Sequence, residues 1–413
     1  MKPIYFFMAF LLCGFGLSFI YLIFRLKQWS HWQGKKLFLL MSGLVLSFAS
    51  VIFGMLYLRQ FPEHMREWIN YYNLVFLIMG LLVSLIFYTF IADMVLFIQK
   101  FLKLITQKNS LTKYYLLKKN LFSKSNLSSK EINQDRRRFL SLSSLSLGSV
   151  AVGNYQAHQD PQINHFVVKL KDLPKEFSGF KIAQISDLHI GPMIGKNYVQ
   201  RVVELTNTLN VDLIALTGDI IDGPLTSILD EVLPLKNLKA KEGVFFITGN
   251  HEYYWGTELW LQQFEKFGFK ILLNQHVVLK KDSAEIVLAG VTDFDASRHD
   301  LSQASDPAKA LIGAPNDAKK ILLAHQPKSY KAANSAKFDL QLSGHTHGGQ
   351  FFPWSLFVAV VQPYYRGLNQ HENLLIYTST GTGFWGPPLR FAIPKEIAVI
   401  ELQPETKVSY SNS

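Results

Sequence analysis

Hydrophobic positions are distributed unevenly along the chain. The first hundred residues contain three long apolar runs, roughly Pro3–Phe24, Leu37–Leu58 and Leu74–Ile98. Each run is long enough to cross a bilayer as a helix, which takes about 20 residues. The first two runs contain no charged residue, and the third contains only Asp93, near its end. The pattern therefore predicts three transmembrane helices within residues 1–98.

From about Asn164 onwards the apolar runs become short, and several of them end in Asp, Asn or His. Runs of four to six residues are typical of buried strands. Stretches long enough for a helix, such as Tyr198–Leu209 and Leu225–Leu238, separate the first three runs, and this alternation predicts βαβ units. The five runs that end in such residues are Phe180–Ile185, Val211–Leu216, Gly243–Ile247, Ile321–Ala324 and Phe338–Leu342.

Three later runs have no room for helices between them: Glu285–Ala289, Leu374–Thr378 and Ile397–Leu402. They indicate additional sheet that is partly antiparallel. We therefore expect an α/β fold over residues 160–405, a four-layer sandwich of two mixed β-sheets flanked by helices.

The net charge of +11 raises the question of a nucleic-acid partner. Residues 1–138 hold 18 Lys/Arg and 5 Asp/Glu, a net +13, whereas the remainder holds 24 basic and 26 acidic residues, a net −2. The basic charge thus belongs to the membrane-proximal part and is a topology signal, so no nucleic acid is expected as a partner. Because positively charged loops stay inside, the first loop and the basic linker 99–138 are predicted to be cytoplasmic. We expect a multi-pass protein of the inner (cytoplasmic) membrane.

Arg136, Arg137 and Arg138 precede a short, weakly apolar run, rich in Ser and Gly, that extends over residues 139–155. This arrangement resembles a twin-arginine export signal, which would place the following domain outside the cytoplasm. The run is either such a signal or a fourth membrane segment. The alternative is an amphipathic or loop segment that keeps the domain in the cytoplasm. Export is the favoured hypothesis. The single cysteine, Cys13, excludes an intramolecular disulfide and a zinc site made of cysteines.

Candidate metal ligands follow five of the predicted strands. In folds with parallel strands, ligands bind just beyond the carboxyl ends of those strands. Oxygen and nitrogen donors without thiolate suit manganese, iron or zinc. Seven donors are too many for one catalytic ion with open positions, so we expect two divalent metal ions. The donors are two carboxylates, four imidazoles and one amide: Asp187, His189, Asp219, Asn250, His325, His345 and His347.

The order DxH, GDxxD, GNH[D/E], H and GHxH resembles the signature of calcineurin-like metallophosphoesterases, in particular their membrane-associated phosphodiesterase branch. The resemblance covers about residues 160–405 and extends to Gly348-Gly349-Gln350 and Gly381–Arg390. Its elements are Asp187-Leu188-His189, Gly218-Asp219-Ile220-Ile221-Asp222, Gly249-Asn250-His251-Glu252, His325 and Gly344-His345-Thr346-His347.

The resemblance implies a division of labour among these residues. One metal ion would be held by Asp187, His189 and His347, and the other by Asn250, His325 and His345, with Asp219 bridging both. A hydroxide held between the ions would attack phosphorus. His251 would be catalytic, stabilising the transition-state charge or protonating the leaving oxygen. Asp222 would orient His251.

The expected activity is hydrolysis of a phosphodiester or pyrophosphate bond, on a substrate that the membrane anchor suggests is lipid-linked. One specific alternative is a UDP-2,3-diacylglucosamine pyrophosphohydrolase of lipid A synthesis, which requires a cytoplasmic site. A non-catalytic membrane binding module is a third hypothesis, disfavoured by the complete ligand set. Arg390 either contacts a phosphate or is a structural or exposed arginine, which is the favoured interpretation. Asp293 and Asp295 are left out because the ligand set is complete without them.

Overall fold

The structure is a computed structural model that describes residues 2–30, 33–61, 67–106 and 129–405. The chain divides into two compact units, one formed by residues 1–55 and 74–151 and the other by residues 56–73 and 152–413. The first unit consists of helices, and the second contains both β-sheets. Much of the predicted basic linker, residues 107–128, lies outside the described part of the chain.

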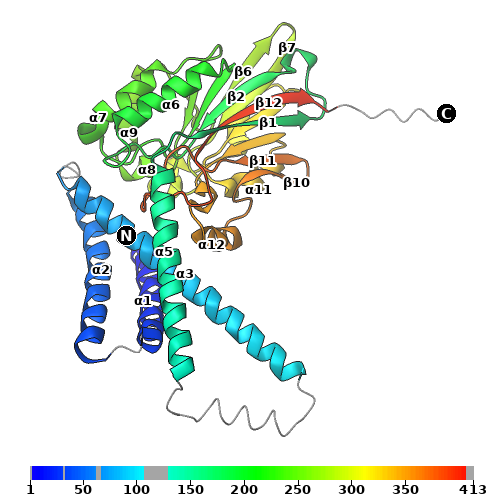
Figure 1. Cartoon of the computed structure of the whole chain (residues 1–413). Helices are drawn as coiled ribbons and strands as arrows, with labels where there is room; N and C mark the ends of the chain where they lie inside the picture. Colours follow the sequence, from blue (N-terminus) through cyan, green and yellow to red (C-terminus); the bar gives the residue numbers. More distant parts are fainter. Residues whose placement is uncertain (1, 31–32, 62–66, 107–128, 406–413) are drawn as a thin grey trace. The chain divides into compact units, whose positions relative to one another are not determined.

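Helices α1 (Lys2–Ser30), α2 (Gly34–Gln60) and α3 (Ile69–Thr106) contain the three predicted spans (Figure 1). Two described segments, Gly34–Gly54 and Ile69–Lys103, are long and apolar enough to cross a membrane. Because α3 continues to Thr106, Asp93 lies well inside the helix instead of near its end. Its carboxylate accepts hydrogen bonds from Nε of Arg25, at 2.6 Å, and from the hydroxyl of Tyr21. This pairing satisfies a charged group in an otherwise apolar helix.

Helix α5 (Ser129–Ala157) is continuous through the twin-arginine-like motif and the apolar run 139–155. The sequence analysis placed Arg136–Arg138 in a linker, whereas the structure places them inside this helix. Nη1 of Arg138 donates to Oδ1 of Asp135 at 3.0 Å, an i,i+3 pair that supports the helix. Residues 152–157 of the helix belong to the second unit.

The first sheet has six strands. Strands β2 to β5 are parallel, and β12, from the end of the chain, lies between β1 and β2, parallel to β1 and antiparallel to β2. Helices α6, α7 and α9 cover its outer face, where Val202, Ile214 and Phe264 are buried (Figure 1). In spatial order the strands are β1 (Gln162–Leu170), β12 (Glu396–Pro404), β2 (Phe180–Ile185), β3 (Leu213–Thr217), β4 (Val244–Ile247) and β5 (Lys270–Ile271). The helices are α6 (Lys196–Thr208), α7 (Leu225–Val232) and α9 (Thr257–Lys266).

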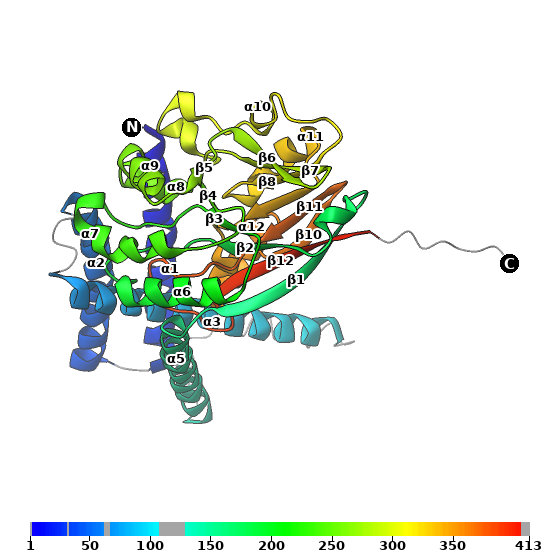
Figure 2. The ribbon, with the colours of Figure 1, turned by 90° about the horizontal axis from the view of Figure 1, so that it is seen from above.

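The second sheet is also mixed. Its four central strands are parallel, and the outer strands β10 and β6 are antiparallel to their neighbours. Helices α10 (Pro307–Ala310) and α11 (Tyr330–Ser335) lie beside it, over an outer core that includes Val287, Leu322 and Phe338 (Figure 2). In spatial order the strands are β10 (Gly367–His371), β11 (Leu374–Thr378), β9 (Leu340–Ser343), β8 (Lys319–Leu323), β7 (Ala284–Gly290) and β6 (Gln275–Lys281).

The two sheets pack face to face around the main hydrophobic core. Because successive side chains of a strand point to opposite faces, each central strand supplies one set of residues to this core and another to the outer helices. The predicted four-layer α/β sandwich is therefore confirmed. Two short helices, α8 (Asn250–Tyr254) and α12 (Trp354–Val361), follow strand ends. The core between the sheets includes Ile182, Leu213 and Phe245 from the first sheet and Ile286, Leu323 and Leu342 from the second.

Candidate metal centre

The carboxyl ends of parallel strands from both sheets bring the predicted ligands together. Strands β2, β3 and β4 are neighbours in the first sheet, and β8 and β9 are neighbours in the second. One group of donor atoms, all within 4.8 Å of one another, comes from Asp187, His189 and His347, and another from Asp219, His325 and His345. Oδ1 of Asn250 lies 3.0 Å from Nδ1 of His345 and so adjoins the second group. All seven sequence-predicted donors thus lie at one end of the sandwich.

Five of these seven residues have a positive φ angle, which is uncommon for residues other than glycine. Such conformations cost free energy and concentrate at functional sites, where the surrounding structure holds them in place. Here they turn the chain sharply just after the strands. The five residues and their φ angles are Asp187 (52°), His189 (50°), Asp219 (53°), His345 (70°) and His347 (51°).

Two glycines of the motifs are required by the close approach of carboxylates. A Cβ atom at Gly249 would lie 2.2 Å from Oδ1 of Asp219, and one at Gly344 would lie 2.2 Å from Oδ2 of Asp187. Any side chain at either position would displace a candidate ligand. The glycine before the Asn-His pair and the glycine before the His-Thr-His segment therefore serve the site directly.

The first group is built around two imidazole rings that face each other. Nε2 of His189 lies 3.0 Å from Nε2 of His347, which in turn lies 3.4 Å from Oδ1 of Asp187. The amide of His345 donates to both oxygens of Asp187, at 2.9 and 3.0 Å, and fixes that carboxylate. Burial, and after it the charge of the nearby His251, lowers the pKa of His189 to about 3. His189 is therefore neutral at neutral pH, the form that binds a metal ion.

In the second group a ring nitrogen of His325 faces a carboxylate oxygen of Asp219. Nδ1 of His325 donates to the carbonyl oxygen of Thr217 at 2.8 Å, which leaves Nε2 as the lone-pair nitrogen of the neutral ring. This Nε2 lies 3.1 Å from Oδ2 of Asp219. Although burial lowers the pKa of His325, the carboxylate of Asp219 raises it well above its usual value. Without a metal ion, a proton on Nε2 therefore separates these two atoms. A divalent metal ion would take the place of that proton, and the donor set fits such an ion.

Asp219 connects the two groups. Its Oδ2 lies 3.1 Å from Nε2 of His325, 3.9 Å from Nε2 of His189 and 4.0 Å from Nε2 of His251. Burial raises the pKa of Asp219, but the charges of His325 and His251 outweigh burial and hold it well below its usual value. An ionised carboxylate in this position is suited to bridge two cations.

His251 lies beside these groups, held by Asp222. Nδ1 of His251 and Oδ1 of Asp222 are 3.0 Å apart, and Nε1 of Trp255 donates to the same oxygen at 2.9 Å. Burial lowers the pKa of His251, but Asp219 and Asp222 outweigh burial and raise it to about 9. The ring of His251 is therefore protonated at neutral pH, with Nε2–H towards Asp219. The rings of Tyr254 and Trp385 lie 5.1 and 5.5 Å from it, between ring centroids.

Glu252 is a residue to which sequence analysis gave no role. Its side chain is fully buried and accepts hydrogen bonds from the amides of Gly249 (2.7 Å), Asp219 (3.0 Å) and Ile220 (2.8 Å). It thereby joins the loop after β3 to the loop after β4, and these loops carry two of the candidate ligands, Asp219 and Asn250. The sequence does indicate this role. Glu252 stands three residues after Gly249, which caps helix α8, and an acidic residue at that position is a helix-capping pattern.

Arg390 is fully buried, and its guanidinium is occupied by the backbone. Nη1 donates to the carbonyl oxygens of Thr380 (2.7 Å) and His347 (3.2 Å), and Nε donates to that of Gly383 (3.0 Å). The favoured interpretation of a structural arginine agrees with these contacts. Asp293 is buried as well, accepting a hydrogen bond from Nε2 of Gln326 at 3.1 Å, and burial raises its pKa to about 6. It belongs to neither donor group among the described residues.

Comparison with known proteins relates the chain to one family. Residues 180–349 match the family described as calcineurin-like phosphoesterase. An uncharacterized metallophosphoesterase of Helicobacter pylori (strain ATCC 700392 / 26695) is 40% identical over 263 residues, which cover 63% of this chain and 69% of the relative. A transmembrane protein with metallophosphoesterase domain from Danio rerio is 34% identical over 259 residues, covering 61% of this chain and 59% of the relative.

Among solved structures, the sulfate thiohydrolase SoxB of Thermus thermophilus, in complex with glycerol, has a TM-score of 0.36 and 14% identity. The match covers 56% of this chain and 58% of that chain. The transmembrane relative and the apolar segments of α2 and α3 together support association with a membrane. The bacterial relative, the matched region and the gathered donor residues lead to one assignment: the chain belongs to the calcineurin-like metallophosphoesterase family and is a metal-dependent phosphoesterase.

Proposed function

We propose that the chain is a membrane-anchored phosphoesterase that hydrolyses a phosphodiester or pyrophosphate bond of a lipid-linked substrate at a site for two divalent metal ions. The observation that carries this proposal is the position of Oδ2 of Asp219 between the two donor groups. Asp187, His189 and His347 would hold one ion, and His325 and His345 would hold the other together with Asn250. Asp219 would be shared.

The ions, when bound, would activate water and neutralise charge on the phosphoryl oxygens. Hydrolysis forms a bond between the water oxygen and phosphorus and breaks the ester bond, so the leaving oxygen needs a proton. Nε2 of His251 carries that proton, because its Nδ1–H is committed to Asp222 at 3.0 Å. Trp255 fixes Asp222 and hence the orientation of His251.

An aromatic rim beside His251 supports an ester with an apolar substituent. Tyr254 and Trp385 are about half exposed, and both contact the His251 ring that would protonate the leaving oxygen. The leaving alcohol would therefore contact the rings of Tyr254 and Trp385. Such a surface favours a bulky or apolar leaving alcohol over a small hydrophilic one.

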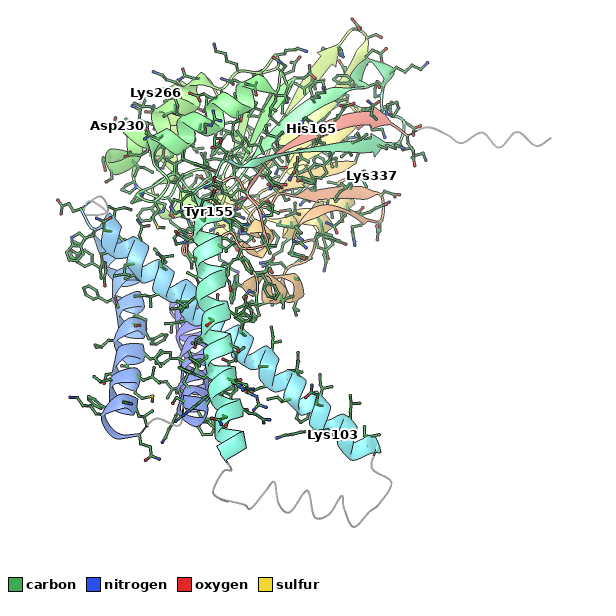
Figure 3. The ribbon with its side chains drawn as sticks, in the orientation of Figure 1. Lys103, Tyr155, His165, Asp230, Lys266 and Lys337 are labelled. Atoms are coloured by element: carbon green, nitrogen blue, oxygen red, sulfur yellow. The ribbon has the colours of Figure 1, made fainter. Side chains whose placement is uncertain are left out.

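The reaction is tested on the full chain in detergent after removal of metal and reloading with Mn²⁺, Fe²⁺ or Zn²⁺. We expect metal-dependent hydrolysis of bis(p-nitrophenyl) phosphate, faster than that of p-nitrophenyl phosphate. Asp219→Asn should reduce turnover by at least about 100-fold, as expected when a group that stabilises the transition state is lost. Asp230→Asn, an exposed position on α7, is the matched control and should behave as the wild type (Figure 3).

Absence of turnover under every metal loading would contradict the proposal. Turnover restricted to UDP-2,3-diacylglucosamine would instead favour the lipid A alternative, with its cytoplasmic site. Membrane topology is tested independently by fusing compartment-specific reporters after Asp160. We propose an extracytoplasmic catalytic unit. The charge of the loops favours a cytoplasmic linker 99–138, and the twin-arginine-like segment that follows it would carry the unit across the membrane. A cytoplasmic signal, or unchanged localisation when Arg136 and Arg137 are both replaced by lysine, would contradict twin-arginine export.

A further inference from the structure

Helix α12 (Trp354–Val361) is apolar except for the buried Ser355, and much of its apolar surface is exposed. Leu356, Phe357 and Val361 are about half exposed, and Val360 is 84% exposed. Apolar side chains gathered in this way on two turns of helix form a patch that, on a protein surface, indicates a binding partner. We call these four residues the α12 patch.

The sequence around the α12 patch has the composition of a segment at a membrane interface. Residues 348–365 contain no charged side chain, and the first one that follows is Arg366. Tyr364 and Tyr365 precede it, and the Arg366 guanidinium lies 5.2 Å from the Tyr365 ring centroid. An apolar centre flanked by tyrosines and arginine is typical of helices that lie in the headgroup region.

The α12 patch is coupled to the candidate metal centre by tight packing. His347 begins the short turn His347–Gly349, only seven residues before α12. A Cβ atom at Gly349 would lie 2.4 Å from Cα of Ser355, so this turn and the helix are in direct backbone contact. Any surface that α12 enters is therefore brought close to the metal centre.

The segment that connects the catalytic unit to the apolar helices indicates what the α12 patch binds. The amide of Phe352, just before α12, donates to the carbonyl of Phe391 at 2.9 Å, and the amide of Arg390 donates to the carbonyl of Gly153 in α5 at 2.9 Å. The start of α12 and the end of α5 thus hold the same loop. These last turns of α5, residues 152–157, belong to the same unit as α12, and Figure 3 labels Tyr155 among them. In the sequence, α5 follows the apolar helices and so connects this end of the catalytic unit to the membrane. The bilayer is therefore the apolar surface that the α12 patch would contact.

We propose that the α12 patch inserts into the boundary between headgroups and acyl chains of the bilayer and holds the metal centre at the lipid surface. Insertion removes apolar side chains from water, which stabilises the bound arrangement in proportion to the area buried. The insertion itself does not depend on the reaction. Its consequence, that the ester is reached from the bilayer, rests on the proposed function.

The insertion is tested with a spin label on the full chain in phosphatidylethanolamine/phosphatidylglycerol vesicles. Cys13→Ser removes the single native cysteine, and the label is then attached at Val360→Cys or at Ile312→Cys. Ile312 is 76% exposed and follows α10, which makes it the matched control. For each label, the rate of collision with oxygen is divided by the rate of collision with a water-soluble nickel complex. This ratio should be several times higher for the label at position 360 than for the label at position 312. Equal ratios would overturn the proposal, as would labels at 360 that are shielded from both reagents and couple to a second chain.

Turnover measurements distinguish failure of the membrane insertion from failure of the proposed function. Val360→Asp should lower the ratio of turnover on a bilayer-embedded diester to turnover on a soluble diester by about tenfold, equivalent to roughly 1.4 kcal/mol. Ile312→Asp should keep the wild-type ratio. An unchanged ratio in Val360→Asp, with both esters hydrolysed, would overturn insertion and leave the hydrolase intact. Absence of turnover on either ester in the wild type would overturn the proposed function, and the label ratios would still decide insertion.

Discussion

Nη2 of Arg390 lies 3.0 Å from Nδ1 of His347, while Nη1 of the same guanidinium donates to the His347 carbonyl. Both the backbone and the ring of a candidate ligand are therefore held by one buried arginine. The amide of Arg390 is in turn fixed by the carbonyl of Gly153 in α5. A chain of contacts thus runs from the end of α5 to the metal centre.

Replacement of Arg390 by lysine should weaken metal binding. A lysine ammonium cannot reproduce the planar fork that serves three carbonyls and the ring of His347. Loss of a group that orients a ligand typically costs about 10–100-fold in metal affinity. Titration of the metal-free full chain with Zn²⁺ against a chelating indicator measures this change. Arg366→Lys, at an exposed position, is the control, and equal affinity in the two variants would show that Arg390 does not position His347.

Glu252→Gln should destabilise the loops after β3 and β4. The amide group of glutamine offers one acceptor oxygen in place of two, so a backbone N–H of Gly249, Asp219 or Ile220 loses its partner. The expected loss in unfolding free energy is roughly 1.5–3 kcal/mol. It is measured as a lower Tm of the metal-free full chain. Glu258→Gln, exposed on α9, should leave Tm unchanged, and an equal Tm for both variants would rule out this role.

Gly153→Val should disturb the contact between α5 and the loop that carries Arg390. A Cβ atom at Gly153 would lie 3.1 Å from Cβ and 3.2 Å from the backbone nitrogen of Phe391, so a larger side chain would have to displace this residue. Overpacking of this kind costs about 1–3 kcal/mol. Gly148 lies on the same helix, and a Cβ there has no neighbour within 4 Å, so Gly148→Val is the control. Tm should fall for Gly153→Val alone, and a fall of equal size in both would indicate a general effect of valine in α5.

Because the pKa of Lys395 is lowered, we expect the stability of the folded chain to rise with pH. Burial, and after it the charge of Arg390, lowers the pKa of Lys395 from 10.5 to about 7, while its Nζ donates to the Ala157 carbonyl at 2.7 Å. Between pH 7 and 10.5 the unfolded chain therefore holds more protons than the folded chain, so this residue makes stability increase with pH. Tm of the wild type should rise relative to that of Lys395→Met across this window. Lys266→Met, exposed on α9, should follow the wild type, and parallel curves for all three proteins would refute the assignment.

The sequence predicted which donor residues lie together, because the pattern was local. Each candidate ligand stands just after a short apolar run, and parallel strands place their carboxyl ends together. Phe180–Ile185, for example, was predicted and is strand β2. The spacing of the runs likewise predicted α6: the stretch Tyr198–Leu209 is long enough for a helix, and the structure has one over Lys196–Thr208.

Features that depend on distant partners were not predictable. Strand β1 pairs with β12, more than 200 residues further along the chain, and nothing in either segment identifies the other. Arg390 becomes buried because it meets carbonyls from several separate turns, and those turns meet only after the sheets have formed. Helix α5 was missed at its beginning because residues 129–138 are polar and lack an apolar period.

The central claim, that Asp219 joins two metal sites, is tested most directly by counting metal ions. The full chain is stripped, saturated with Mn²⁺ and desalted, and metal and protein are quantified by mass spectrometry and amino-acid analysis. We predict two ions for each chain, and one when both His189 and His347 are replaced by alanine. Saturation of the wild type at a single ion, or an unchanged content in the double variant, would contradict the account.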